Sequence, residues 1–468
     1  MRGTRVVVGA VLCALVALTG CGGGGGEGEG GGTSEEGDNT LTIWTTEDLE
    51  DRVAAQKKIM DAWGSQSGTT VELVPVAEDQ LTTTLTSAAA ANELPDAIAA
   101  LPLNGVNQLR TDDLLDTDAA NEIVDGLGRD TFVPRALELT SQDGTQLAVP
   151  SDSWAQLLFY RTDLFKAAGL AEPKTYDDVQ KAAQALQKGK TAGIVAGTAP
   201  ADSFTQQTFE WAALANGCQL TDAGGAVTLN SPNCVGAFDF YGNLLKNYST
   251  KGNQDADTTR ATYFAGDAAM VIWSSFLLDE LAGLRNDALP TCPQCKDDPQ
   301  WLAKNSGVVT TLQGPNGTAP AAFGEIVSWS VLNDANPKIK ELVSYMMSDG
   351  YLDWLGIAPE GKVPTRSGTS ANPQEYVDGW AKLEAGVDKQ ELLSNIYSAE
   401  TLKAVATSTG SFDRWGILQG QGALAGAVGG QFVAPQAIAK MINEGASGAD
   451  AAAEAQKAAE QVKTDLGG

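Results

Sequence analysis

Several tryptophans and carboxylates stand at or just after the ends of predicted strands, where the side chains of an open α/β sheet converge. Trp44 ends the first apolar strand, and Glu47 and Asp48 lie in the turn that follows it. Trp273 and Ser274 follow a second apolar run. Flat indole surfaces beside planar polar groups match a molecule with apolar C–H faces and a rim of hydroxyls, such as a sugar. We therefore predict a binding site for a small polar molecule.

The predicted ligand contacts extend beyond these residues to other strand ends, hinge segments and helix starts. The full set is Trp44, Glu47, Asp48, Asn104, Trp154, Gln207, Trp211, Trp273, Ser274, Glu325, Arg366, Arg414 and Trp415. We place Trp154 in a polar loop, because Ser151, Asp152 and Ser153 precede it. We expect the tryptophans at 44, 154 and 273 to face one shared crevice.

Most of these residues also have a purely structural interpretation. Glu47 and Asp48 suit a helix N-terminus, where negative charge is favourable in any case. Trp211 and Trp415 suit an apolar core, as does the tryptophan at 273. The asparagine at 104 suits a turn. Glu325 lies beside a strand that should be buried, so either a ligand or a salt bridge would satisfy it.

The composition excludes several kinds of chemistry. The chain contains no histidine, which removes Ser-His-Asp and Cys-His catalysis and histidine-bearing zinc sites. The net charge of −28 argues against binding to nucleic acid. The two aspartates in residues 255–257 are spaced as in a calcium-binding loop, but the glycine and final glutamate of an EF-hand are missing. Residues 420–430 are glycine-rich without a nucleotide-binding pattern. We expect no metal and no cofactor. We interpret residues 255–257 as a solvated loop and the glycines as close helix packing or turns.

The first residues are typical of an export signal. Arg2 and Arg5 precede an apolar run over 6–18 that is too short to span a bilayer. The run ends in Leu18-Thr19-Gly20-Cys21, which resembles the lipobox of bacterial lipoproteins. That resemblance implies cleavage after residue 20, lipidation of Cys21 and anchoring at the outer face of the cell membrane. Residues 21–40 are nearly all Gly, Glu, Ser, Thr and Asp, so we predict a flexible tether.

Four further cysteines remain in the exported part. Cys218 and Cys234 flank a short loop, and Cys292 and Cys295 form a Cys-Pro-Gln-Cys motif. Four cysteines in an exported protein indicate two disulfides, and of the three possible pairings we favour the two local ones. A redox role for the motif is disfavoured, because its surroundings are typical of a loop and not of a helix start. A four-cysteine zinc site is also disfavoured.

Alternation of strands and helices is the main structural pattern. Strands are predicted at 41–44, 71–74 and 96–99, with amphipathic helices between them, the first of which ends at Gly64 and Gly68. This order predicts a βαβαβ unit with a parallel sheet. Later segments predict helices at 176–188, 205–215, 235–247, 337–347 and 450–466, and a strand at 326–331.

Four stretches resemble the solute-binding proteins of ABC importers, in the group that contains the maltose-binding proteins. The resemblance covers about 41–466. The stretches are the opening Leu-Thr-Ile-Trp strand with its helix; Ala148-Val149-Pro150 followed by Leu158–Leu170 and Pro173–Asp178; Phe264–Met270; and Lys362-Val363-Pro364-Thr365-Arg366. Arg161 and Tyr176 depart mildly from the family pattern.

Membership in that family implies an α/β fold of the type II, maltose-binding-protein-like class, with two lobes joined by crossing hinge strands. The implied N-terminal lobe is 40–149 plus 327–363, and the C-terminal lobe is 150–326 plus 364–468. Crossing strands would lie near Val149, Ile326 and Val363. The lobes would close around a mono- or oligosaccharide, and a membrane permease would recognise the closed monomer.

Alternative functions stay open at this point. Glu47, Asp48 and Glu325 could supply the carboxyl pair of an exported glycosidase. The acidic candidates also permit a polyamine, whereas glycerol-phosphate would need more basic residues. A lipid-anchored adhesin is a third possibility.

Overall fold

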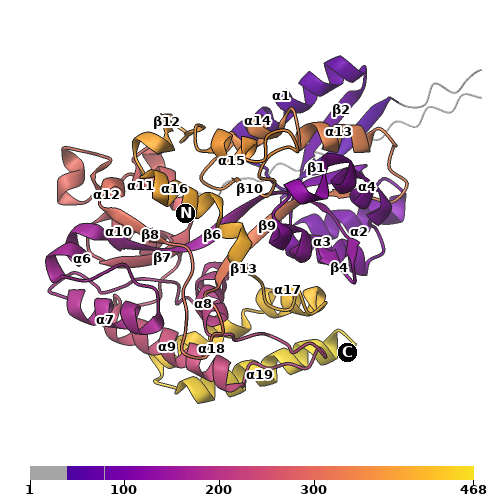
Figure 1. Ribbon diagram of the computed structural model, residues 1–468. Coiled ribbons are helices and arrows are strands. Elements are labelled where there is room, and N and C mark those ends of the chain that lie inside the picture. Colours follow the sequence, from indigo (N-terminus) through magenta and orange to yellow (C-terminus); the bar gives the residue numbers. More distant parts are fainter. Residues whose placement is uncertain (1–38, 78–79, 468) are drawn as a thin grey trace, which may run out of the picture. The chain divides into compact units, whose positions relative to one another are not determined.

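The computed structural model describes residues 39–77 and 80–467. Cys21 and the predicted signal peptide lie outside them. The main sheet contains β1 (Thr40–Thr45), β2 (Thr70–Pro75), β3 (Ala97–Pro102), β6 (Val149–Arg161), β7 (Met270–Ser274), β8 (Ser306–Val309), β9 (Ala322–Val331), β10 (Val363–Pro364) and β13 (Phe412–Asp413). The strand order is β10-β6-β9-β3-β1-β2, with β7 and β8 joined to β6 and β13 joined to β9 (Figure 1).

The N-terminal part confirms the predicted βαβαβ unit. Helices α1 (Glu50–Ser67) and α2 (Leu81–Ala91) connect β1, β2 and β3, which pair in parallel. Of the two glycines predicted to end α1, Gly68 does so, in the left-handed conformation at φ 70°, whereas Gly64 lies inside the helix. The strand ends of β1 and β3 therefore lie side by side at one edge of the sheet.

Two long strands, β6 and β9, connect this unit with the rest of the chain. They pair antiparallel from Val149–Trp329 to Ala155–Gly324, with a register shift between Pro150 and Asp152. Beyond this region β6 pairs with β7 and β8, whereas the other end of β9 pairs with β3. A segment predicted as a polar loop is thus part of β6, and Trp154 is a strand residue. The preceding residues Ser151, Asp152 and Ser153 form hydrogen bonds inside the protein, which the polarity of the sequence alone did not reveal.

The remaining elements are helices and two short hairpins. The helices are α3 (Leu103–Thr111), α4 (Thr117–Leu127), α5 (Pro134–Leu139), α6 (Thr162–Ala168), α7 (Tyr176–Leu186), α8 (Ser203–Ala215), α9 (Pro232–Tyr248), α10 (Ala256–Phe264), α11 (Leu277–Leu281), α12 (Trp301–Lys304), α13 (Ile339–Met346), α14 (Tyr351–Leu355), α15 (Glu375–Trp380), α16 (Ala399–Ala406), α17 (Gly422–Gly430), α18 (Val433–Asn443) and α19 (Gly448–Asp465). The hairpins pair β4 (Ser141–Gln142) with β5 (Thr145–Gln146), and β11 (Glu384–Ala385) with β12 (Glu391–Leu392). The five helices predicted from the sequence are all present.

Side-chain caps explain where several helices begin. Thr175 accepts a hydrogen bond from the backbone of Asp178 in a capping box before α7, and Ser447 caps α19 in the same way. Asp255 caps α10 and accepts from the backbone of Thr258. The acidic residues at 255–257 therefore belong to a helix start, and the expectation of a solvated loop was wrong there.

Both predicted disulfides are present. Cys218 bonds to Cys234 and Cys292 bonds to Cys295. The second pair lies at the start of a short 3-10 helix, Pro293–Lys296, where we had expected a loop. Among the described residues, no helix has both the length and the hydropathy needed to cross a bilayer.

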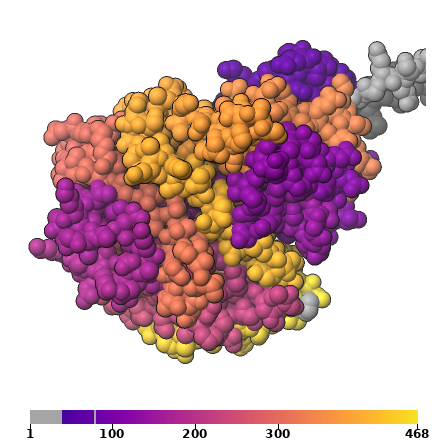
Figure 2. Space-filling model, in the orientation of Figure 1, coloured from indigo at the N-terminus to yellow at the C-terminus, as the bar shows by residue number. Residues whose placement is uncertain are grey.

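The glycine-rich segment packs closely, as expected. Helix α17 contacts α3, and a Cβ atom on Gly422 would lie only 2.2 Å from the side chain of Asn107. Only glycine permits this approach. Residues far apart in the sequence are therefore in contact, and Figure 2 shows the yellow C-terminal segment against the dark N-terminal residues.

Candidate functional site

The candidate site lies where the carboxyl ends of β3 and β13 face each other along β9. Pro102 at the end of β3 pairs with Val327, and Asp413 at the end of β13 pairs with Phe323. Because β3 runs antiparallel to β9 and β13 runs parallel to it, both strands end near Glu325. Crevices at such reversals of strand order are where open α/β sheets bind ligands.

Glu325 connects the two strand ends, and the region around it, between β3, β9 and β13, is here called the crevice. Its Oε1 accepts a hydrogen bond from the backbone N–H of Leu103 at the start of α3, at 2.9 Å. Its Oε2 pairs with Nη1 of Arg414, which follows β13. Glu325 is 7% exposed and Arg414 is 8% exposed, so the pair is almost completely desolvated. The carboxylate is thus held both by a helix N-terminus and by a guanidinium.

The ion pair continues into α8 through a residue that the sequence did not single out. Arg414 Nε lies 3.6 Å from Glu210 Oε1, which also accepts from the backbone of Trp415 at 2.8 Å. Glu210 Oε2 in turn accepts from the amide of Gln206 at 3.3 Å. Burial raises the pKa of Glu210, and Arg414 opposes this effect.

Aromatic rings surround the same crevice. Trp154 is paired directly opposite Glu325 in the β6–β9 ladder. Its ring lies 5.8 Å from the ring of Phe323 and 6.4 Å from that of Phe276. The guanidinium of Arg52, from α1, lies 5.5 Å from the centre of the Phe276 ring. Indole and phenyl faces therefore stand beside buried charges, which is the combination that a hydroxylated ring requires.

Several buried polar atoms near this crevice form no hydrogen bond within the described part of the chain, although Arg414 Nε is ion-paired with Glu210. Both amide atoms of Gln156, two residues after Trp154 in β6, are unpaired although the residue is 0% exposed. Oε1 of Gln206 and Nε of Arg414 also lack a hydrogen bond. Leaving a buried polar group unpaired costs about 1–3 kcal/mol, so these atoms are available to bind water or a polar ligand.

The strand register separates the tryptophans that we expected to share one crevice. Leu157 pairs with Trp273, and Gln156 pairs with Ser274. Side chains alternate along a strand, so Trp154, Gln156 and Ser274 lie on one face of the sheet and Trp273 on the other. Trp273 packs against Phe204 and donates its indole hydrogen to the carbonyl of Ala256 at 3.1 Å.

Trp44 belongs to a third environment. It is 8% exposed and packs in an apolar cluster with Leu81, Leu85 and Ile98. The expectation of one crevice bounded by the three tryptophans was therefore wrong. The reason is the two-residue period of a strand, which decides the face of each residue only after the pairing register is known.

Other predicted contacts are distributed as follows. Arg366 is bound by the protein: it donates to Thr131 Oγ1 at 2.8 Å and to the carbonyl of Met347 at 2.6 Å. The indole of Trp415 donates to the carbonyl of Cys218 at 2.9 Å. Trp211 is 1% exposed inside the apolar cluster of α8 and α9.

Three further predicted contacts lie partly or fully at the surface. Asn104 is exposed on the first turn of α3, Asp48 is exposed, and Gln207 is half-buried on α8. Asn104 lines a cavity of about 440 Å³ between α2, α3 and α17. This cavity starts at the same α3 N-terminus that binds Glu325.

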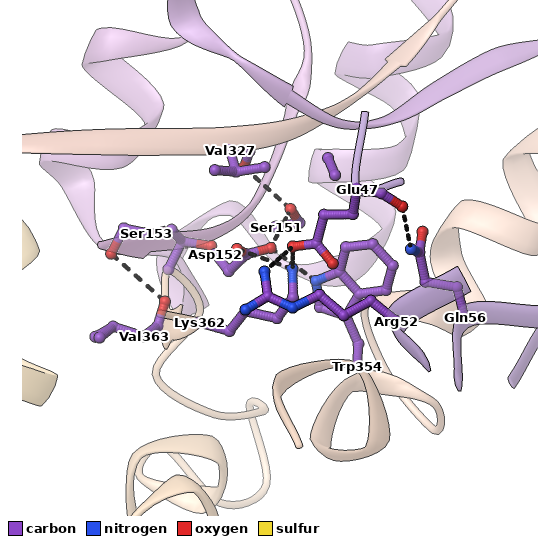
Figure 3. A network of polar contacts seen from close by, with 12 residues as sticks. Glu47, Arg52, Gln56, Ser151, Asp152, Ser153, Val327, Trp354, Lys362 and Val363 are labelled. Carbon is purple, nitrogen blue, oxygen red and sulfur yellow. Dashed lines mark hydrogen bonds and ion pairs between the residues drawn. The ribbon is translucent and has the colours of Figure 1, made fainter. Parts of the chain in front are cut away.

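Glu47 belongs to a second buried network beside the crevice (Figure 3). Lys362 is 1% exposed and its Nζ lies 2.6 Å from Glu47 Oε1 and 3.4 Å from Asp152 Oδ2. The indole of Trp354 donates to Asp152 at 2.7 Å, and Lys362 lies 4.3 Å from the centre of that ring. The network joins the turn after β1 to β6 and to the residue just before β10, so it fixes the strands on which the crevice is built.

A third charged group, here called the acidic cluster, consists of Asp279, Glu280 and Glu360. All three are buried, and Glu280 pairs with Arg260 at 3.1 Å. Burial raises the pKa of Asp279 to about 8, with a further contribution from the nearby Glu360. Burial also raises the pKa of Glu280 and of Glu360 to about 7. Oδ2 of Asp279 and Oε2 of Glu360 have no hydrogen-bond partner among the described residues.

Sequence reasoning missed several residues of the crevice, among them Gln156, Glu210 and Phe276. Gln156 could have been found, because it lies two positions after Trp154 and therefore on the same face of a strand. Phe276 lies in the turn between β7 and α11, so strand periodicity does not place it. Glu210 carried no signal, since it lies in a helix whose two faces are both buried. Within the described ranges, no group of three His, Cys, Asp or Glu side chains could hold a metal ion.

Comparison with known proteins gives consistent matches. The family model for bacterial extracellular solute-binding proteins matches residues 58–288. An ABC transporter periplasmic-binding protein of Escherichia coli K12, YcjN, is 24% identical over 389 residues, which cover 81% of this chain and 84% of YcjN.

Solved structures share the fold at lower identity. The GacH receptor of Streptomyces glaucescens, solved with acarbose, has a TM-score of 0.65 at 18% identity, covering 91% of this chain and 98% of GacH. The cyclic α-maltosyl-1,6-maltose binding protein of Arthrobacter globiformis has a TM-score of 0.66 at 18% identity, covering 90% and 98%. These structures confirm the predicted fold class.

Proposed function

Because this chain belongs to the bacterial extracellular solute-binding proteins of ABC transporters, we propose that it captures a mono- or oligosaccharide or a polyol and delivers it to a membrane permease. The family consists of carriers, so the prediction that the protein is not an enzyme is confirmed. The ligand would lie in the crevice beside Glu325, between a lobe of 40–149 plus 327–363 and a lobe of 150–326 plus 364–468. Lipidation at Cys21 would keep the monomer near the permease.

The observation that supports this proposal most strongly is the set of buried, unpaired polar atoms beside Trp154. Gln156, Gln206 and Arg414 offer both donors and acceptors, and a sugar hydroxyl can act as either. Trp154 and Phe276 offer the apolar faces. Structural relatives are described with sugars and polyols: acarbose, maltose, maltotetraose, laminaribiose, D-tagatose, D-mannitol and ribitol.

Thermal unfolding with a ligand panel tests the proposal. The seven compounds above form the panel, and spermidine and glycerol-3-phosphate represent the cationic and anionic alternatives. A ligand at 100 times its Kd stabilises the folded state by about 2.7 kcal/mol. An unfolding entropy of about 2.1 cal/mol/K per residue gives roughly 1 kcal/mol/K for 468 residues, so the expected rise in Tm is about 3 °C. A shift with spermidine alone, or with none of the compounds, would overturn the proposal.

A matched pair of variants separates binding from folding. Gln156→Leu replaces a buried amide that has no partner with an apolar group of similar size, so the Tm of the free protein should stay the same or rise. Its affinity for the panel ligand should fall about ten-fold or more. Ser330→Ala also removes a buried, unpaired polar atom, but from the part of β9 that pairs with β3, and it should leave the affinity unchanged.

A further inference from the structure

The acidic cluster lies where the two proposed lobes meet. Asp279 and Glu280 belong to α11, in the lobe of 150–326 plus 364–468, whereas Glu360 precedes β10 in the other lobe. Each of the three is at most 5% exposed. Oδ2 of Asp279 and Oε2 of Glu360 form no hydrogen bond with the described residues. Carboxyls from both lobes are thus enclosed together, although none of them belongs to the crevice.

A close contact across the lobe boundary joins the cluster to the crevice. A Cβ atom on Gly361, the residue after Glu360, would lie only 1.8 Å from the ring of Phe276. The same ring lies 6.4 Å from that of Trp154, where we place the ligand. Phe276 stands three positions before Asp279 in the chain. A movement that separates the lobes at this contact would therefore also separate Glu360 from Asp279.

Three arginines face the cluster, but each of them already binds another carboxylate. The pairs are Arg260 with Asp257 at 2.7 Å, Arg285 with Asp287 at 3.0 Å and Arg52 with Glu47 at 3.9 Å. Arg260 also pairs with Glu280 at 3.1 Å. Within the described ranges, no ion pair reaches Asp279 or Glu360. If all three carboxyls of the cluster were ionised, the guanidiniums would not compensate them.

The enclosed cluster therefore favours protonated carboxyls. Burial raises the pKa of Asp279 to about 8 and that of Glu280 and Glu360 to about 7, from ordinary values of about 4. The neighbouring carboxyls add to this effect, and the arginines oppose it. Tyr397 also faces Asp279, but burial keeps the pKa of its phenol well above the usual range, so it stays uncharged.

Separation of the lobes would reverse this protonation. Water that enters between Glu360 and Asp279 would solvate their charged forms, and a greater distance would weaken their repulsion. The carboxyls would then ionise at neutral pH and take up protons again on closure. We infer that ligand binding is coupled to proton uptake by the acidic cluster, so that the protein holds its ligand more tightly as the pH falls. The inference rests on the proposed function and adds a regulation of the same site.

The direction and the size of the effect follow from proton linkage. A carboxyl whose pKa is higher in the closed state favours binding fully below its open-state pKa, and this contribution is lost as the pH rises through its closed-state pKa. With values of about 7 and about 4, one carboxyl should raise the Kd about ten-fold between pH 6 and pH 8. Each further coupled carboxyl should increase this ratio.

Isothermal titration calorimetry tests the inference with the sugar or polyol of the panel that raises Tm most. Wild-type protein is titrated at pH 6 in two buffers of different ionisation enthalpy, because the difference in heat gives the number of protons taken up. We expect about one proton for each coupled carboxyl. This measurement requires no variant, so it stands even where a substitution in the cluster prevents folding.

Two variants then assign the protons to the cluster. Glu360→Gln and Asp279→Asn each replace a carboxyl by a neutral group of the same shape as its protonated form. At pH 8 each should bind the ligand about ten-fold more tightly than the wild type, and each should take up fewer protons at pH 6. Glu341→Gln is the matched control, since Glu341 is exposed on α13 in the same lobe as Glu360, and it should behave like the wild type.

The outcomes separate this inference from the proposed function. A Kd that is the same at pH 6 and pH 8, without proton uptake, would overturn the inference and leave the proposed function intact. The same holds for a pH dependence that both variants keep in full, because Glu210, whose pKa is also raised by burial, would then be its source. If no compound of the panel binds at either pH, the proposed function is overturned and the inference with it.

Discussion

Replacing Arg414 by methionine should destabilise the protein although it removes only one positive charge. The guanidinium is 8% exposed and lies between two buried carboxylates, Glu210 at 3.6 Å and Glu325 in direct contact. Methionine keeps most of the side-chain volume. The variant leaves both carboxylates buried without their counter-charge. Among the described residues, the hydrogen bonds that remain to them come from the Leu103 N–H, the Trp415 N–H and the amide of Gln206.

The size of the effect follows from the cost of breaking a buried ion pair. Removing one partner typically costs about 3–5 kcal/mol, because an uncompensated charge stays in a poorly polarisable environment. With roughly 1 kcal/mol/K of unfolding entropy for 468 residues, the expected fall in Tm is about 3–5 °C at pH 7. The loss should shrink at low pH, because a carboxyl that can be protonated no longer needs the guanidinium.

The assay is calorimetric unfolding of three proteins: wild type, Arg414→Met, and a triple variant with Arg414→Met, Glu210→Gln and Glu325→Gln. Removing the charge from every member of the network should restore most of the lost stability, because replacing a complete buried group of charges often changes the free energy of unfolding only slightly. Ligand affinity should remain low in the triple variant. If Arg414→Met unfolded at the wild-type temperature, or if the triple variant were the least stable, the reasoning about the buried network would be refuted.

The other predictions concern the rings, the acidic cluster and a disulfide. Trp154→Ala and Phe276→Ala should each weaken binding of the panel ligand by about 10- to 100-fold in calorimetric titration, since each removes a stacking face; unchanged affinity would place the ligand elsewhere. The free energy of unfolding, measured in urea between pH 5 and 8, should fall as the pH rises. In the folded protein the carboxyls of the acidic cluster have pKa values of about 7–8, so they keep their protons up to about that pH, whereas the carboxyls of the unfolded chain have already released theirs. The free energy of unfolding should fall by up to about 1.4 kcal/mol per pH unit for each carboxyl, and Glu360→Gln should reduce this pH dependence. A stronger pH dependence in that variant would contradict the assignment of the effect to the acidic cluster. Replacing Cys218 and Cys234 together by serine should cost roughly 3 kcal/mol, because their bridge closes a loop with a sequence separation of 16; unchanged Tm in scanning calorimetry would show that the loop is already ordered without it.

The sequence predicted the elements of the fold well because their signals are local. Strand and helix periodicity, the glycines after helices and the Thr175 cap all act within a few residues. The two disulfides were also predictable, since each pair is close in sequence. The error at 151–154 has a non-local cause. Asp152 looks like a loop residue until Trp354 and Lys362, about 200 positions later, supply its partners, and the hydroxyl of Ser151 donates to Asp152 and to the carbonyl of Val327.

The candidate site could be predicted only in part for the same reason. Glu325, Arg414 and Trp154 were selected individually, but what brings them together is the register between β6 and β9 and the meeting of β3 with β13. Register cannot be derived from composition, and shifting it by one residue would exchange Trp154 for Ala155 on the crevice face. The separation of Trp154 from Trp273 follows from this single geometric fact.

If the protein closes around its ligand as proposed, the unpaired polar atoms would help it avoid closing while empty. In an open state, Gln156, Gln206 and Arg414 would bind water, and closure would remove that water whether or not a ligand is present. Closure of the empty protein would therefore leave at least three unsatisfied groups, at about 1–3 kcal/mol each, which is enough to keep the empty closed state a minor population. A ligand that pairs with these groups removes the penalty. Its preference for the closed state over the open state therefore includes the free energy of this penalty, in addition to the free energy of the other contacts that it makes. The same buried atoms would thus provide selectivity and also couple binding to closure, and a residue such as leucine at position 156 would weaken both at once.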